Sequence, residues 1–160
     1  MWLGPKCLNA LAYQLLSGNP PESIVPEGSI MASYGIVSKV PLAYEKALAK
    51  TRDALKAEGF GVITEIDVRK TVKEKLGAEF RPYIILGACN PPLAHRAISA
   101  EPEIGLLMPC NVCLWDNGDG TTTVAAIDVK TLFQLVQNPG LAEIAEKVNS
   151  QLRRVLQAVR

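Results

Sequence analysis

The stretch RPYIILGACNPPLAHRAISA, residues 81–100, constrains the fold more than any other part of the sequence. Its first half is an apolar run that predicts a strand from Arg81 to Cys89, buried inside a sheet. Asn90 is a favourable N-cap, and Pro91 and Pro92 then occupy the first turn of a helix, where a missing N–H costs nothing. The chain is therefore expected to turn from a strand into a helix with no loop between them.

The rest of the chain after Met31 repeats this alternation of strands with amphipathic helices. Apolar patterns predict further strands at residues 32–40, 60–66, 105–115 and 121–129, and further helices at 41–58, 68–76 and 138–160. Asp67 is the expected N-cap of the 68–76 helix, and the sequence DNGDG at 116–120 predicts a tight hairpin. We therefore predict a two-layer α+β sandwich, with helices packed on one face of a mixed or mostly antiparallel sheet.

A Pro-rich segment, residues 1–30, precedes the patterned region, and we expect a single domain from residue 31 to residue 160. The segment contains one short stretch of helical pattern, near Leu8 to Leu16, and lacks the uniform apolar core of a secretory signal. Because a second methionine, Met31, opens the patterned region, two interpretations stay open. The segment is either a flexible extension or an upstream stretch that the natural protein does not contain.

The composition favours a cytoplasmic protein. With 48% hydrophobic and 21% charged residues the chain can build one ordinary core, and no apolar run approaches the roughly 18 residues that cross a bilayer. A formal net charge of +1 gives no field that attracts nucleic acid or an anionic membrane, so we expect neither as a partner. Four cysteines in 160 residues, at positions 7, 89, 110 and 113, fit reduced thiols better than a disulfide framework.

The dipeptide Cys-Asn occurs twice, as Cys89-Asn90 and Cys110-Asn111, and is the main candidate for a site. If the strands that carry the two pairs are neighbours, the four side chains converge on one pocket at the end of the 81–89 strand. A thiol beside a helix N-terminus has its pKa lowered by the helix dipole, which would make Cys89 reactive. The alternative is that both cysteines are small, buried and inert core residues.

Charged residues around this strand are further candidates. Lys73 and Arg81 could bind an anionic group, although a solvated helix face explains the basic cluster at residues 69–81 more simply. No aromatic residues are interleaved with that cluster, which disfavours nucleic acid. Glu65 and Asp67 lie two apart on a strand end and so share a face, as an acid-base pair requires, but N-capping is a sufficient reason for Asp67.

The sequence predicts no metal site and names no cofactor. Cys110 and Cys113 have C-x-x-C spacing, but strand side chains three residues apart point to opposite faces, and a zinc knuckle would need a turn there. The loop at 116–120 lacks the glutamate that a calcium loop carries at its twelfth position. The single histidine, His95, falls on the polar side of its predicted helix, which indicates a surface residue.

Three stretches together resemble one known family: GFGVITEID (59–67), FRPYIILGACNPPLA (80–94) and EPEIGLLMPCNV (101–112). They follow one another at the spacing of the family called domain of unknown function 302, and the resemblance extends from about Tyr34 to the C-terminus. It implies a small α+β domain of bacterial or archaeal type that is often a dimer. It implies no established activity.

Three hypotheses about function follow. The first is a small cytoplasmic domain that binds a small ligand, anionic if Lys73 or Arg81 reaches it, in a pocket lined by the two Cys-Asn pairs. The second is a thiol-dependent redox or nucleophilic enzyme that uses Cys89 with Cys110. The third is a homodimeric scaffold or partner-binding module without catalysis, joined through the sheet or the C-terminal helix.

Overall fold

The computed structural model describes residues 34–160, and the expectations for residues 1–30, including the short helix near Leu8 to Leu16, lie outside these residues. The strands are β1 (Gly35–Val40), β2 (Gly61–Asp67), β3 (Tyr83–Cys89), β4 (Cys110–Asp116) and β5 (Thr122–Ile127). The α-helices are α2 (Tyr44–Ala57), α3 (Val68–Leu76), α4 (Pro91–Ala100), α5 (Val129–Phe133) and α6 (Ala142–Val159). Three short 3₁₀ helices complete the described part: η1 (Pro102–Leu107), η2 (Gln134–Val136) and η3 (Pro139–Leu141).

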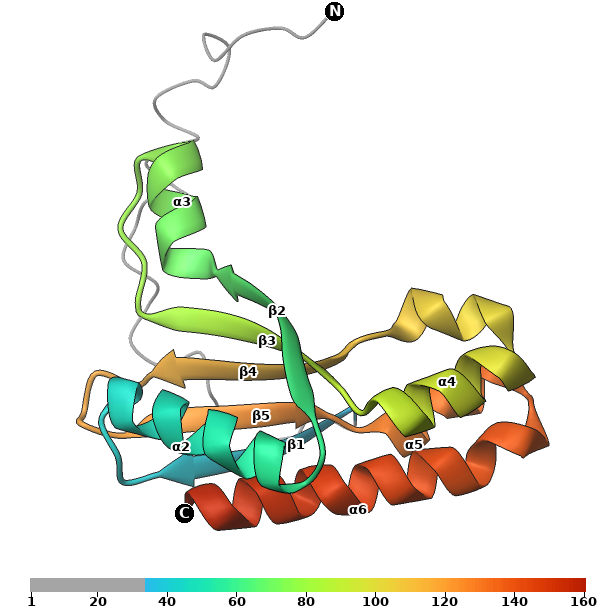
Figure 1. Ribbon diagram of the computed structural model, residues 1–160. Helices are drawn as coiled ribbons and strands as arrows, with labels where there is room; N and C mark the ends of the chain where they lie inside the picture. Colours follow the sequence, from blue (N-terminus) through green and yellow to red (C-terminus); the bar gives the residue numbers. More distant parts are fainter. Residues whose placement is uncertain (1–33) are drawn as a thin grey trace, which may run out of the picture. The chain divides into compact units, whose positions relative to one another are not determined.

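The strands form one antiparallel sheet in the order β1-β5-β4-β3-β2. Helices α2 and α6 lie along one face of this sheet, while α4 and α5 lie near the end at which β3 stops (Figure 1). This arrangement confirms the predicted α+β sandwich with helices on one face. The sheet is wholly antiparallel because every pair of neighbouring strands runs in opposite directions.

The sheet face that meets the helices carries the core. Leu86, Val112 and Ala126 form one cross-strand row on this face and are almost completely buried. Leu55 of α2 and Leu152 of α6 are fully buried within the same cluster. Because side chains alternate along a strand, the residues between the members of these rows point to the opposite face of the sheet.

Two predicted helix starts are confirmed by their hydrogen bonds. The Asp67 carboxylate accepts the Lys70 backbone N–H at 2.9 Å and thus caps α3. The Asn90 side-chain oxygen accepts the Leu93 N–H at a longer 3.4 Å, and Pro91 opens α4 directly after β3. The turn from strand to helix predicted from residues 81–100 is therefore present.

Two strand predictions were too long. Residues 105–107, predicted as the start of a strand, belong to η1, and β4 begins only at Cys110. Pro109 directly precedes that strand, and a proline has no N–H to give to a sheet ladder. At the end of β5, Val129 starts α5 instead of extending the strand, because the Asp128 carboxylate accepts the Thr131 N–H at 3.0 Å and caps a new helix.

Helix α5 was not predicted, and it is fixed to α6 at its N-terminal end. The buried Asn149 accepts the Val129 N–H at 2.8 Å and donates to the Asp128 carboxylate at 3.0 Å. Lys130 forms an ion pair with Glu146 of α6. Within residues 34–160, no helix has both the length and the apolar character that crossing a membrane requires.

Candidate functional site

Cys89 and Cys110 lie side by side at the edge of a small, partly open cavity. The register of β3 with β4 places Cys110 opposite Ala88, next to Cys89. Both thiols line a cavity of about 30 Å³ whose other walls come mainly from apolar side chains, among them Phe60, Leu93, Ala97, Leu107, Met108 and Val148. A cavity of this size has room for about one water molecule, and its mainly apolar lining offers a water few polar partners.

The thiol of Cys110 has a low reactivity as a nucleophile at neutral pH. Burial, followed by the neighbouring Cys89, raises the pKa of Cys110 to about 11. At neutral pH the group therefore stays a protonated thiol, which is a poor nucleophile and a poor partner for thiolate exchange. This counts against the hypothesis of an enzyme that relies on Cys110 as a resolving thiol.

The two asparagines of the Cys-Asn pairs are on different sides of the sheet. Asn90 caps α4 and lines the cavity together with Cys89 and Cys110. Asn111 instead lines a hollow on the opposite sheet face. Cys89, Asn90 and Cys110 therefore line the same cavity. Asn111 points to the opposite sheet face, because side chains alternate along β4. The same alternation separates Cys110 from Cys113, which also lies on the opposite face, as predicted.

The charged candidates lie elsewhere. Lys73 of α3 is paired with Glu79 at 2.9 Å, and Glu65 of β2 is paired with Arg52 at 2.8 Å. Arg81 precedes the start of β3. Cys89 is at the far end of that strand, which spans about 20 Å at the usual rise per residue. These charges do not line the cavity.

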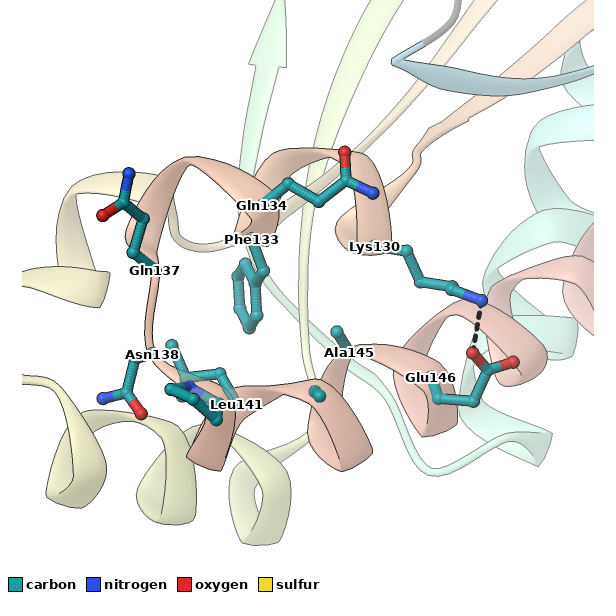
Figure 2. Close-up of a pocket in the computed structure, with 10 residues that line it drawn as sticks. Lys130, Phe133, Gln134, Gln137, Asn138, Leu141, Ala145 and Glu146 are labelled. Carbon is teal, nitrogen blue, oxygen red and sulfur yellow. Dashed lines mark ion pairs between the residues drawn. The ribbon is translucent and has the colours of Figure 1, made fainter.

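A larger cleft lies on the surface between the α5-η2 segment and α6. Its volume is about 460 Å³, which is within the usual range of small-molecule sites. Figure 2 shows Phe133 projecting from α5 towards Leu141 and Ala145 on the opposite side. The Lys130–Glu146 ion pair, at 2.5 Å, stands at one end of the cleft. The cleft therefore has an apolar interior.

Three amides form the polar part of the lining: Gln134, Gln137 and Asn138. The Asn138 side chain already has hydrogen-bond partners: its oxygen accepts the Gly140 N–H at 2.9 Å, and its amide nitrogen donates to Glu101 at 3.2 Å. The side chains of Gln134 and Gln137 are exposed and form no hydrogen bond with the described residues 34–160. Gln137 has a left-handed backbone, φ 47°, which is strained for a residue with a side chain.

No residue of the cleft was a candidate from the sequence. Residues 129–137 show neither the alternation of a strand nor the period of a long helix, and the predicted strand at 121–129 ran into them. Two signals in the sequence could have predicted this segment. Asp128 is a good N-cap and indicates a helix start, and the Asn138-Pro139 pair indicates the end of one segment and the start of the next. In the described part of the chain, no group of three histidine, cysteine or acidic side chains is placed to hold a metal ion.

Comparison with known proteins identifies the family. The family model described as a domain of unknown function, DUF302, matches residues 36–159. The chain belongs to the DUF302 family. It is also similar to a solved structure, an uncharacterized conserved DUF302 protein from Bacillus stearothermophilus, with 28% sequence identity and a TM-score of 0.74. That match covers 81% of this chain and 100% of the other. The comparison with curated proteins gave no match.

The DUF302 match includes both the cavity and the cleft, since all residues that line them lie between 36 and 159. The resemblance predicted from the three sequence stretches is therefore confirmed, and the structural neighbour supports the fold. That neighbour is itself uncharacterized, so the likeness extends to the fold and brings no ligand with it.

The second feature of the DUF302 domain is a sheet face that no helix of residues 34–160 covers. Tyr83 and Trp115 stack on it with ring centroids 5.6 Å apart and planes 5° from parallel. Ile85 and Cys113 form the next cross-strand row with Ile66, which is 49% exposed. This face is apolar across several strands, although its side chains are only partly buried.

Proposed function

We propose that this DUF302 domain binds a small, neutral, amphipathic molecule in the cleft between the α5-η2 segment and α6. The observation that carries the proposal is the cleft itself, with about 460 Å³ of space, an apolar interior at Phe133, Leu141 and Ala145, and exposed amides at Gln134 and Gln137. Pockets that combine an apolar body with a few polar groups at the margin are typical of small-molecule sites.

The charges of the lining favour a neutral ligand over an anionic one. Lys130 and Glu146 are the charged side chains among the described residues that line the cleft, and they are paired with each other. An anionic group would have to compete with Glu146 for the lysine. The exposed amides of Gln134 and Gln137 can each donate and accept hydrogen bonds, which suits a hydroxyl, amide or carbonyl group.

This proposal moves the expected ligand from the Cys-Asn pairs to a neighbouring place. The cavity at Cys89, Asn90 and Cys110 has a volume of about 30 Å³, which is too small for a ligand. The cleft has the volume that the cavity lacks. The two spaces share one wall, the ring of Phe133.

Binding is tested with N-phenyl-1-naphthylamine, a neutral apolar probe whose fluorescence rises on burial, and with 1-decanol as competitor. Ala142 lines the cleft and is exposed, so Ala142→Trp fills the space without disturbing the core. The matched control is Ala158→Trp, at an exposed position of α6 that does not line the cleft. We expect Ala142→Trp to weaken binding at least about tenfold, or 1.4 kcal/mol, and the control to leave it unchanged. Equal affinity in both variants, or no displacement by decanol, contradicts the proposal.

A second function is favoured by the uncovered sheet face: we propose that the domain forms a homodimer through it. Five strands about 4.8 Å apart and about 20 Å long present roughly 500 Å² per copy, so two copies bury roughly 1,000 Å², the lower limit of a specific interface. The Tyr83–Trp115 stack and Ile85 supply the apolar centre that such an interface needs.

Sedimentation velocity at micromolar concentration tests the dimer. Ile66 is 49% exposed, so Ile66→Lys is tolerated in a single copy but places a charge in the proposed interface. Leu106→Lys is the control, because Leu106 is 85% exposed on η1, away from the sheet. We expect a dimer for the natural protein and for the control, and a monomer for Ile66→Lys. A monomer in all three proteins refutes the dimer.

A further inference from the structure

We propose that the cleft and the inner cavity are one binding site divided by Phe133, and that the site takes a neutral molecule with an unbranched alkyl chain. The polar end of this molecule lies at Gln134 and Gln137, and the chain passes Phe133 to end against Cys89 and Cys110. This inference rests on the proposed ligand binding in the cleft. It adds the ligand class and the position of the chain.

The cleft and the cavity are separated by the side chain of Phe133. Phe133 lines the surface cleft on one side and the inner cavity on the other. Its ring is half-buried and packs against the core, and the adjacent residues Ile144 and Ala145 of α6 face the cavity and the cleft respectively. Displacement of this one side chain therefore joins the two spaces, and the volume of the ring is added to them.

The segment with Phe133 is held at both ends, but the side chains of residues 134, 135 and 137 between them are loosely held. Its start is tied to α6 through Asn149, which bonds both Val129 and Asp128, and through the Lys130–Glu146 ion pair. Its end is tied by Asn138, which donates to the Ala100 carbonyl and to Glu101. Between these two anchors the side chains of Gln134 and Gln137 form no hydrogen bond within residues 34–160, and Leu135 is 75% exposed. A local opening of residues 134–137 therefore breaks no side-chain hydrogen bond of Gln134 or Gln137, as expected for a binding element.

The inner cavity suits a hydrocarbon chain. Its lining is almost wholly apolar, so it holds neither a charge nor a hydrated group, whereas dry apolar cavities do accept small hydrocarbons. Phe133 is the residue that lines both spaces in the described part of the chain, so a molecule passing there takes the place of one side chain, which favours an unbranched chain over a fused ring. Each methylene buried beyond Phe133 should tighten binding about fourfold.

The test measures the alkylation of single cysteines by iodoacetamide, read by peptide mass spectrometry, in the full chain. Cys113 is an internal control, because it lies on the opposite sheet face and lines neither space. Phe133→Ala removes the dividing ring, and Leu135→Ala, an exposed position of the same segment, is the matched control. We expect Phe133→Ala to alkylate Cys89 and Cys110 about tenfold faster than the control variant does, with Cys113 unchanged.

Addition of 1-decanol to the Phe133→Ala variant should then slow the alkylation of Cys89 and Cys110 about tenfold and leave Cys113 unaffected. Phe133→Trp, which places a larger ring between the two spaces, should bind 1-hexanol as the natural protein does but lose the gain in affinity from hexanol to decanol. If decanol binds the cleft and Ala142→Trp abolishes this binding, yet Cys89 and Cys110 are not protected, the divided site is wrong and the cleft proposal stands. If decanol does not bind at all, both proposals are wrong.

Discussion

Replacement of Asn149 by alanine should detach the N-terminal end of α5 from α6. Asn149 is 2% exposed and makes two hydrogen bonds, accepting the Val129 N–H at 2.8 Å and donating to the Asp128 carboxylate at 3.0 Å. Its loss leaves the buried Val129 N–H without an acceptor, which costs about 1–3 kcal/mol. The lost bond to a charged acceptor adds about 1 kcal/mol or more.

We therefore expect Asn149→Ala to lower the free energy of unfolding by about 3 kcal/mol and the Tm by about 10 °C. Urea denaturation followed by circular dichroism measures the first quantity, and a thermal scan measures the second. Ser150→Ala, at the next position of α6, is the control and should change the stability by less than about 0.5 kcal/mol. A loss below about 1 kcal/mol for Asn149→Ala would refute the view that this side chain anchors α5.

The pH dependence gives an independent check of the same contact. Burial by itself raises the pKa of Asp128, but hydrogen bonds from Thr131 and Asn149 and the charge of Arg153 outweigh it, so the pKa of the folded protein lies below the usual value. A lowered pKa stabilises the fold above the unfolded value of about 3.9, and this stabilisation is lost as the pH falls through the folded pKa. Asn149→Ala removes one of these bonds, so the stability difference from the natural protein should shrink below about pH 4. Denaturation at pH 7 and pH 3 measures that difference, and an equal difference at both pH values contradicts the assignment.

Three further substitutions test the local structure. Gln137→Gly should stabilise the fold by about 0.5–1 kcal/mol in urea denaturation, because glycine relieves the left-handed strain at φ 47°, and Gln137→Ala should give no gain. Gly87→Ala should lower the free energy of unfolding by about 1–3 kcal/mol. The added Cβ would lie 2.1 Å from the Thr64 hydroxyl oxygen and 2.8 Å from the Pro109 ring. An unchanged Tm contradicts that close packing. Asn90→Ala should cost only about 0.5 kcal/mol, the low end for an N-cap, because the cap bond is long at 3.4 Å, and a loss above about 2 kcal/mol would show a larger role for this side chain.

The sequence alone was enough for the fold class and for the elements whose ends are set by local chemistry. Asn90 with Pro91 predicted the strand-to-helix corner, and Asp67 predicted the start of α3. The alternation of side chains along β4 predicted that Cys110 and Cys113 lie on opposite faces. These features depend on neighbours within a few residues, whose hydrogen bonds and sterics are the same in any fold.

The candidate site was predicted in part. Cys89, Asn90 and Cys110 do meet, because β3 and β4 are neighbours in the sheet. The expectation that Asn111 joins them did not allow for the alternation that carries it to the other face. Lys73 was a candidate only through its position in the sequence, and in the structure it lies on α3, paired with Glu79.

Local caps at Asp128 and Asn138 mark the two ends of the segment that borders the cleft, but the tertiary structure decided that a cleft forms there. Asn149 of α6 lies twenty residues further along the chain and accepts the hydrogen bond of the Val129 N–H. This bond holds the start of α5 against α6, and the cleft lies beside it. Phe133 lines both the cleft and the cavity only because of this docking. Local patterns determine which segments are helices and strands, but contacts between distant segments determine register, faces and hollows, since those depend on which buried groups find partners.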